Sequence, residues 1–304
     1  MEAYTDFAAV YDTFMDETPY EVWGDFVVGL IEKYGVSRPS HAEGSKEPGT
    51  AFAHPSGVYG NRIRPEHSRY KPAFIEEAEE NSEKALEQEK NLVVELGCGT
   101  GSFSQVLRSR GYDIIGIDMS PEMLDLARKK SVEAGMDIMY IEQDMRELDL
   151  YCTAGTIVSV CDSINYILED EELVETFRLV NSFLYPGGVF IFDFNTLHKY
   201  RDVIGDATIA ENRVDCSFIW ENYFHEDGHI NEYDLTIFAR TGEEGDIFRR
   251  SVETHYQRGY ELDEMIGFVK KAGLEFITSI DADTYEEPDE NSERIYIVAG
   301  EKGK

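Results

Sequence analysis

Residues 92–101 read Leu-Val-Val-Glu-Leu-Gly-Cys-Gly-Thr-Gly, an apolar run that leads directly into three alternating glycines. The apolar run predicts a buried strand, and the glycines predict a tight turn from that strand into a helix. Glycine also lets a ligand approach the backbone closely, so the stretch predicts a nucleotide-like ligand on this loop. A glycine triplet alone is weak evidence, because ordinary strand-to-helix turns contain it too.

The second expected strand strengthens this interpretation. It ends in Asp118, about twenty residues beyond the glycines, where a carboxylate can accept hydrogen bonds from ribose hydroxyls. The lesser alternative is that Asp118 only introduces the next helix. A dinucleotide fingerprint would place its third small residue one position after Gly101, where this chain has Ser102. The spacing of the three glycines therefore differs from the dinucleotide fingerprint, and this difference decides which nucleotide we expect on the loop.

From residue 91 onward, expected strands and helices alternate at short intervals, which is typical of βαβ units and a mainly parallel sheet. The first five expected strands are residues 92–96, 113–118, 138–141, 156–160 and 189–193. After the second of these strands, Ser120 is expected to cap a helix and Pro121 to be its first residue. Another helix should begin at Asp170 and end before Pro186-Gly187-Gly188.

The apolar period changes to two after residue 195, which predicts antiparallel strands. Residues 216–220 and 233–238 should form a hairpin, with a third strand at 247–258. A helix at 261–272 and strands at 274–280 and 294–299 then complete the pattern. We therefore predict an α/β fold: a doubly wound, mainly parallel seven-stranded sheet with helices on both faces and an antiparallel β element inserted at about 207–258.

Three regions are expected along the chain. Residues 1–36 show helical spacing in two pieces on either side of Pro19, which predicts an N-terminal helical lid. Residues 37–90 hold five of the nine prolines and then a charged stretch, which predicts a flexible insertion followed by a solvated helix. Residues 91–304 form the predicted catalytic core.

Charge and composition narrow the class of partner. The chain has 61 Asp and Glu against 28 Lys and Arg, for a net charge of −33, which disfavours nucleic acid as a partner. The acidity can attract cationic ligands, although solubility is the commoner explanation. The four cysteines form no C-x-x-C pair, so we expect reduced thiols and no metal site. The chain shows no long apolar run and no secretory signal, so we expect a cytoplasmic protein without membrane contact.

Four motifs together resemble the class I S-adenosylmethionine-dependent methyltransferases. They are Glu95-x-Gly97-x-Gly99-x-Gly101, Asp118, Gln143-Asp144-Met145, and Leu184-x-Pro186-Gly187-Gly188. Further stretches are similar to a bacterial group of small methyltransferases without an assigned substrate, and sugar N-methyltransferases share the general plan. These stretches include Tyr11-Asp12, Pro19-Tyr20, Cys161-Asp162-Ser163-Ile164-Asn165-Tyr166 and His255-Tyr256-Gln257-Arg258. The segment at 37–90 departs from the family pattern.

The resemblance implies S-adenosylmethionine as the cofactor and a set of residues around it. The glycine loop would hold the methionine end, Asp118 the ribose, and Asp144 with Met145 the adenine. Tyr11, Tyr20 and Trp23 would belong to the lid over the cofactor. The full set of expected cofactor contacts is Glu95, Gly97, Cys98, Gly99, Gly101, Asp118, Met119, Asp144, Met145, Cys161, Tyr11, Tyr20 and Trp23.

Methyl transfer needs in-line approach and a water-poor site, so positioning can supply much of the rate without a dedicated catalytic residue. His255 and Tyr166 are the candidates for substrate contact or proton removal, although a structural histidine is at least as common. The predicted function is methyl transfer to an oxygen or nitrogen nucleophile of a small molecule. The alternatives are a nicotinamide-dependent oxidoreductase and a cofactor-binding protein without turnover. The sequence leaves the oligomeric state open.

Overall fold

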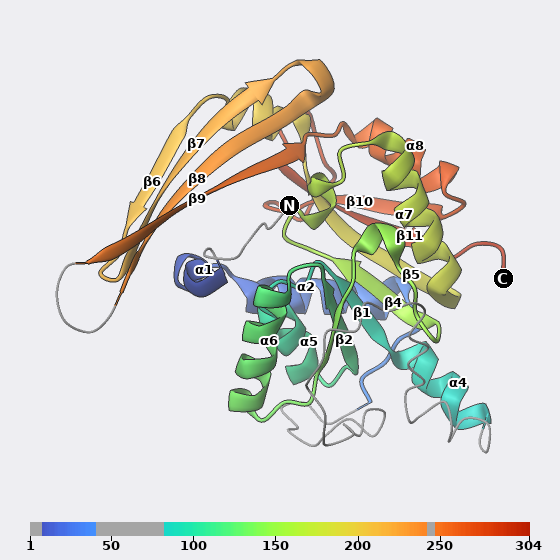
Figure 1. Ribbon diagram of the computed structural model, residues 1–304. Coiled ribbons are helices and arrows are strands. Elements are labelled where there is room, and N and C mark those ends of the chain that lie inside the picture. Colours follow the sequence, from blue (N-terminus) through green and yellow to red (C-terminus); the bar gives the residue numbers. More distant parts are fainter. Residues whose placement is uncertain (1–7, 41–81, 242–246) are drawn as a thin grey trace.

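The computed structural model describes residues 8–40, 82–241 and 247–304. Within these residues, a seven-stranded sheet has the strand order β10-β11-β5-β4-β1-β2-β3, and a four-stranded sheet has the order β6-β7-β8-β9. Figure 1 shows the smaller sheet projecting from the main body as an arm. The predicted fold, a doubly wound and mainly parallel sheet with an inserted antiparallel element, is confirmed.

The large sheet is parallel except where β11 pairs antiparallel with β5 and β10. Its strands are β1 Val93–Leu96, β2 Ile114–Asp118, β3 Met139–Glu142, β4 Ala154–Ser159, β5 Leu184–Asn195, β10 Glu275–Asp281 and β11 Arg294–Gly300. Alternate residues of a strand face opposite sides, so Val93 and Val94 enter separate core clusters and both are fully buried. A sheet buried on both faces explains why its strands read as continuous apolar runs.

Helices cover both faces of this sheet, as the sequence predicts. The cluster on one face contains residues of α2 (Tyr20–Tyr34), α5 (Ser102–Ser109) and α6 (Pro121–Ala134). The cluster on the other face contains residues of α7 (Asp170–Phe183) and α8 (Leu262–Lys271). None of the helices in the described ranges is long and apolar enough to cross a membrane.

The helix predicted to begin at Asp170 and to end before Pro186-Gly187-Gly188 is confirmed as α7, but these three residues are not what ends it. The chain leaves α7 at Phe183, because Leu184 takes an extended backbone while its N–H closes the helix on the Val180 carbonyl. Pro186-Gly187-Gly188 therefore lies inside β5 and does not end the helix. The pairing of β4 with β5 shifts register at this place, between Ala154 and Thr156. The irregular strand accommodates a proline and two glycines that a regular central strand would disfavour.

The arm has one strand more than the sequence analysis predicts. Its strands are β6 Thr208–Asn212, β7 Cys216–His225, β8 Ile230–Arg240 and β9 Phe248–Arg258. Four of the five residues of β6 are exposed, so this edge strand lacks the apolar alternation that predicts β7 to β9. The turn between β7 and β8 contains the short helix η4, Asp227–His229, with Gly228 and His229 at positive φ.

The N-terminal region is tied to the core more extensively than a lid alone would be. Val27 and Ile31 of α2 are completely buried against the sheet, so α2 is a layer of the core. The short helix α1, Ala8–Phe14, precedes it. Within the described residues, α1 is the N-terminal helix that lies outside this core layer, and the lid prediction rests on it.

The insertion begins later than residue 37. The buried Ser37 hydroxyl lies 2.8 Å from the hydroxyl of Thr156 and 3.1 Å from the carbonyl of Lys90, and it can hydrogen-bond both. The expected charged helix is present as α4, Ser82–Asn91. The prediction of a flexible segment otherwise falls on residues 41–81, which lie outside the described residues.

Candidate functional site

The glycine loop lies at the carboxyl end of β1, where the open edge of a parallel sheet usually holds ligands. Gly97, Gly99 and Gly101 have φ values of 70°, 52° and 72°, a backbone region that L side chains rarely adopt. A Cβ atom at Gly97 would collide with the Ser163 side chain, and one at Gly101 would collide with Tyr140. A Cβ at Gly99 would meet nothing within 4 Å. Gly97 and Gly101 therefore allow Ser163 and Tyr140 to pack closely against the loop. Gly99 instead leaves open space over the loop.

Asp118 connects the ends of β1 and β2. Its Oδ2 accepts the backbone N–H of Gly99 at 2.8 Å, and its Oδ1 accepts the N–H of Ser120 at 2.9 Å. Burial raises the pKa of this carboxyl. The N–H of Met119 is a third backbone donor to this carboxylate. A carboxylate has four lone-pair sites, so Asp118 can hold the loop and still accept a hydroxyl. Met119, beside it, is 57% exposed at the surface.

Glu95 and Cys98 are buried beneath the loop. Glu95 accepts a hydrogen bond from the Ser104 hydroxyl, and burial, aided by the charge of Asp118, raises its pKa to about 8. Glu95 therefore holds its proton at neutral pH. Burial also raises the pKa of the Cys98 thiol, which lies against Gly116. Both side chains therefore belong to the buried layer on which the glycine loop rests.

The end of β3 brings two predicted adenine contacts near the loop. Asp144 caps the short helix η1, Met145–Glu147, by accepting the backbone N–H of Arg146 at 2.9 Å. Burial opposes ionisation, but the Arg146 guanidinium, 2.6 Å away, holds the pKa of Asp144 below its usual value. The Met145 Cε atom lies 3.4 Å from where a Cβ at Gly97 would stand.

The turn after β4 is held from below by a carboxylate that the sequence analysis missed. Cys161 and Asp162 have positive φ values of 61° and 53°. Their backbone N–H groups donate to the two oxygens of Asp193, at 3.1 and 2.8 Å. Asp193 is fully buried at the end of β5, and Arg294 approaches it at 3.8 Å. An acidic residue at the end of the apolar run 189–193 was the signal available in the sequence.

Arg294 also connects Trp23 to this turn. Its guanidinium lies 4.2 Å from the centroid of the Trp23 ring, a cation–π arrangement. Tyr20 packs edge-on against Trp23 at 5.7 Å between ring centroids and hydrogen-bonds Tyr11. Burial raises the pKa of Tyr20, and Cys161 lies near enough to contribute. The predicted lid residues thus lie beside the β4 turn.

His255 and Tyr166, the predicted catalytic pair, do come together. The Tyr166 hydroxyl lies 2.7 Å from that of Tyr233, whose ring stacks on His255 at 4.9 Å. His255 is only 4% exposed, and its Nε2 lies 3.4 Å from Glu253. In this arrangement the imidazole is covered, so a role in proton removal needs a movement of the arm. Its catalytic role stays a prediction.

A chain of polar side chains that the sequence analysis did not single out lies next to this pair. The Gln257 amide donates to Asp162 at 2.6 Å, and the Tyr200 hydroxyl donates to the Gln257 carbonyl oxygen at 3.0 Å. Tyr200 belongs to η3, Lys199–Ile204, and in turn accepts from Asn195 at 2.9 Å. Burial, the largest cause, raises the pKa of Asp162 to about 6.

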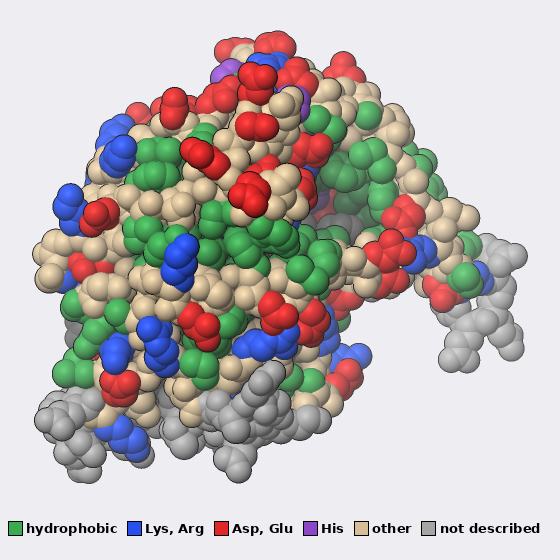
Figure 2. Space-filling view, turned by 180° about the vertical axis from the view of Figure 1, so that it is seen from behind, with side chains coloured by type: hydrophobic (Ala, Val, Ile, Leu, Met, Phe, Trp, Pro, Cys, Tyr) green, Lys and Arg blue, Asp and Glu red, His purple; other side chains and the backbone are tan. Residues whose placement is uncertain are grey.

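The helix α1 spans the glycine loop and the arm. Asp12 pairs with Lys130 at 2.6 Å and accepts the Thr100 hydroxyl at 2.6 Å. Two residues further along, Phe14 packs edge-on against Phe218 of β7 at 4.8 Å. Figure 2 shows the molecule hollowed where the arm meets the core, with hydrophobic side chains on the arm side. The predicted site residues thus lie near the sheet edge, α1 and the arm.

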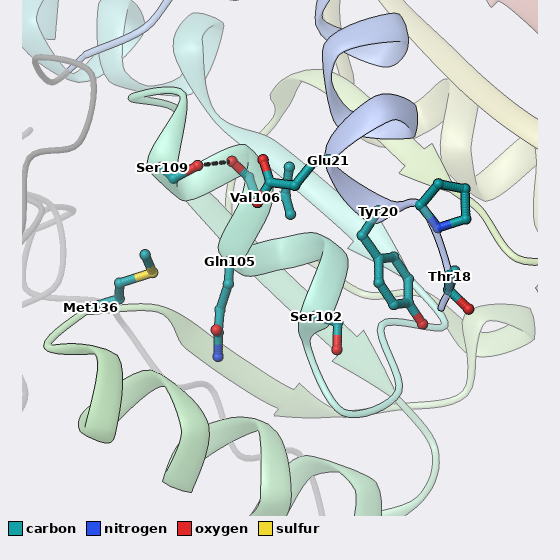
Figure 3. A pocket seen from close by; sticks show the side chains of 9 residues that line it. Thr18, Tyr20, Glu21, Ser102, Gln105, Val106, Ser109 and Met136 are labelled. Atoms are coloured by element: carbon teal, nitrogen blue, oxygen red, sulfur yellow. Dashed lines mark hydrogen bonds between the residues drawn. The ribbon is translucent and has the colours of Figure 1, made fainter. Parts of the chain in front are cut away.

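A separate open pocket lies on the outward face of α5 (Figure 3). It is lined by Thr18, Pro19, Tyr20, Glu21, Ser102, Gln105, Val106, Ser109 and Met136. Ser102, Gln105, Val106 and Ser109 form the side of α5 turned away from the sheet, because Phe103 and Leu107 are buried beneath the helix. Gly99 is not among the lining residues of this pocket, whereas Tyr20, a predicted cofactor contact, is.

Comparison with known proteins agrees with this architecture. Residues 93–188 match the model of a methyltransferase domain family. The Bacillus subtilis protein YqeM, which is named as a methyltransferase, is 35% identical over 214 residues, or 69% of this chain and 84% of that protein. A protein of Geobacillus sp. with a methyltransferase name is 29% identical over 97% of this chain and 98% of its own length.

Two solved structures share the fold of the described residues. The S-adenosylmethionine-dependent methyltransferase from Clostridium acetobutylicum has a TM-score of 0.72 and 22% identity, with 99% of each chain covered. Streptomyces venezuelae DesVI has a TM-score of 0.65 and 16% identity, covering 97% of this chain and 98% of its own. At these identities the likeness shows the fold alone.

Proposed function

The chain belongs to the class I S-adenosylmethionine-dependent methyltransferases, and from this membership we propose that it methylates an oxygen or nitrogen nucleophile of a small molecule. When bound, S-adenosylmethionine supplies an electrophilic methyl group on a sulfonium centre. A nicotinamide-dependent oxidoreductase is not favoured, since the relatives that cover the chain are methyltransferases.

The open space over Gly99, beside the carboxylate of Asp118, is the observation that carries this proposal. A side chain there would fill the space that the cofactor needs, while Asp118 can accept from ribose hydroxyls. Asp144 and Met145 would hold the adenine, and Cys161 would lie near the sulfonium end. Asp144 can keep its pair with Arg146 and still accept an amino group, because an ionised carboxylate has four lone-pair sites.

The acceptor would enter between the arm and the end of β4. Aromatic and polar side chains from the inner face of the arm support a small organic acceptor, because such sites are mostly apolar with a few polar groups that fix orientation. Trp220, Tyr233 and Leu235 line this face. The net charge of −33 supports a partner other than nucleic acid. All four cysteines carry free thiols, which supports the cytoplasm as the compartment.

Binding and turnover test the proposal separately. Calorimetry with S-adenosylmethionine and with NAD should give saturable binding of the first alone. Release of S-adenosylhomocysteine on addition of a bacterial metabolite extract then distinguishes an enzyme from a binding protein. Saturable binding of NAD without S-adenosylmethionine binding would contradict the proposed function. Cofactor binding without release by any extract would favour the binding protein.

A further inference from the structure

Asp162 occupies the place where the parts of the proposed site meet. It follows β4, which pairs directly with the glycine-loop strand β1, and its side chain contacts β9 of the arm. Two consecutive non-glycine residues, Cys161 and Asp162, are held at positive φ by hydrogen bonds to Asp193. Such backbone strain persists where the surrounding structure enforces it, and it concentrates at functional sites.

The orientation of the Asp162 carboxylate is fixed by a buried chain of amides and hydroxyls. Because the Tyr200 hydroxyl donates to the Gln257 carbonyl oxygen, the amide nitrogen of Gln257 must face Asp162. Asn195 fixes Tyr200 from the other side. Gln257, Tyr200 and Asn195 are 3%, 1% and 5% exposed, so the chain is held by packing as well. This preorganisation serves a group that must meet a substrate in one geometry.

The described part of the chain contains no ion pair that includes Asp162, although the charges of Lys199 and Arg294 both lower its pKa. The direct contacts of these two cations are with other groups: Lys199 donates to the side-chain oxygen of Asn195 at 3.0 Å, and Arg294 approaches Asp193. Among the described residues, the hydrogen bond from Gln257 reaches Oδ2 and leaves Oδ1 able to accept. Asp162 is nevertheless partly accessible to solvent. A desolvated, partly accessible carboxylate that no described cation contacts directly favours a cationic ligand.

We propose that Asp162 binds the acceptor directly and that the acceptor is an amine, an inference that rests on the proposed methyl transfer. The amine enters as its ammonium ion and donates a charge-assisted hydrogen bond to Oδ1. One N–H bond breaks and its proton passes to the carboxylate. The freed nitrogen lone pair then forms the new bond to the methyl carbon, while the carbon–sulfur bond breaks and its electron pair stays on sulfur. The proton later leaves Asp162 for solvent.

Proton affinity explains why an amine fits better than an alcohol. A carboxylate is too weak a base to remove the proton of an alcohol, which holds it far more tightly than a carboxylic acid does. An alkylammonium ion, with a pKa near 10, carries a charge that binds the carboxylate and a proton that it can lose at moderate cost. Burial of Asp162 raises its pKa toward the neutral range, which lowers that cost further.

The position of a labelled methyl group tests the substrate class. The full chain is incubated with S-(CD3)-adenosylmethionine and a small-molecule extract of bacterial cells, and tandem mass spectrometry locates the label in the product. Label on an amine nitrogen is expected. Label on oxygen or carbon would overturn the inference while leaving methyl transfer intact. Absence of S-adenosylmethionine binding in calorimetry would instead overturn the proposed function, so the two failures are distinguishable.

The variant Asp162→Asn tests the residue. Its cofactor affinity, measured by calorimetry, should stay within about twofold of the parent, and transfer should fall by roughly 100-fold or more. Asp202→Asn, an exposed aspartate of η3, is the matched control and should keep parental transfer. Parental transfer in Asp162→Asn would overturn the assignment.

A binding measurement adds a second readout. With S-adenosylhomocysteine bound, cyclohexylamine should bind more tightly than cyclohexanol, and Asp162→Asn should remove the difference. Equal binding of both compounds to the parent would contradict the inference.

Gln257 acts as a positioning residue, and a pH profile tests that role. Its hydrogen bond favours the ionised form of Asp162, so Gln257→Leu should raise the pKa of Asp162 and move the rise of transfer rate to higher pH. The titratable and charged groups that face Asp162 are Cys161, Asp193, Lys199, Tyr200, Tyr233 and Arg294. All of them remain in the variant. A profile identical to that of the parent would refute the positioning role.

Discussion

Asp12 of α1 and Lys130 of α6 form an ion pair with 2.6 Å between Oδ2 and Nζ, although 118 positions separate them. Lys130 also donates to the hydroxyls of Thr100 and Ser102, at 3.1 and 2.7 Å. One ammonium group thus joins α1, α6 and the glycine loop. Because Phe14 of α1 also contacts Phe218 of the arm, α1 links the arm to the glycine loop.

We expect Asp12→Asn to weaken S-adenosylmethionine binding by loosening α1 over the loop. The Asp12 side chain is 41% exposed and that of Lys130 26% exposed, so solvent screening limits the effect to about 0.5–1 kcal/mol. Calorimetry at low and at high salt measures it, and the deficit should shrink as salt rises. Lys129→Met, which removes the surface pair with Glu133 on the same helix, is the control. Equal deficits in both variants would argue against a specific role of Asp12.

Gly99→Val should abolish cofactor binding while the sheet stays folded. The added side chain would enter the open space over the loop, and the φ of 52° adds strain on the order of 1–2 kcal/mol. Gly29→Val, on α2, is a matched control because its Cβ also meets nothing within 4 Å and its φ is ordinary. Circular dichroism establishes folding, and calorimetry measures binding. A folded Gly99→Val protein with parental affinity would remove the loop from the cofactor site.

Asp118→Ala should weaken S-adenosylmethionine binding by roughly 1.5–3 kcal/mol, the range for a lost charge-assisted hydrogen bond. The variant also frees the N–H groups of Gly99 and Ser120, so the loop itself should become less ordered. Asp118→Asn separates the two effects, since the amide oxygen can still accept one of these bonds. Titration with S-adenosylhomocysteine gives the affinities. Parental affinity in Asp118→Ala would place the ribose elsewhere.

The proton on Glu95 predicts a pH dependence of stability with a definite sign. Burial raises its pKa from 4.5 to about 8, so between these values the unfolded chain has lost a proton that the folded chain keeps. Stability from this group therefore falls by about 1.4 kcal/mol per pH unit across that window and levels off above it. Glu95→Gln removes the dependence.

Urea unfolding of the parent and of Glu95→Gln, at pH values from about 5 to about 9, measures this effect. The variant should gain on the parent as pH rises through the window, because its amide can accept the Ser104 hydroxyl without ionising. The other titrating groups are common to both proteins and cancel in the difference. A difference in unfolding free energy that does not change with pH would show that Glu95 is ionised in the folded protein.

The sequence predicts the fold well because its signals are local. The apolar run 92–96, the three glycines and Asp118 lie within about one βαβ unit, so spacing alone places them at one sheet edge. The missed strand β6 is the counterexample: its exposed residues carry no apolar period. Likewise, the sequence pattern predicts that Ser37 begins a polar insertion. Its burial against Thr156 shows that it belongs to the core.

The doubly wound sheet, the ligand loop and the candidate residues on that loop follow from the amino-acid sequence alone. The tertiary structure decided which distant residues serve that loop. The pairs Asp162 with Gln257 and Asp12 with Lys130 join residues 95 and 118 positions apart. No periodicity links such positions, because hydrophobic patterns report which face of an element is buried and not which polar side chains meet across packed elements. Those meetings depend on how the arm, α1 and the sheet edge pack together.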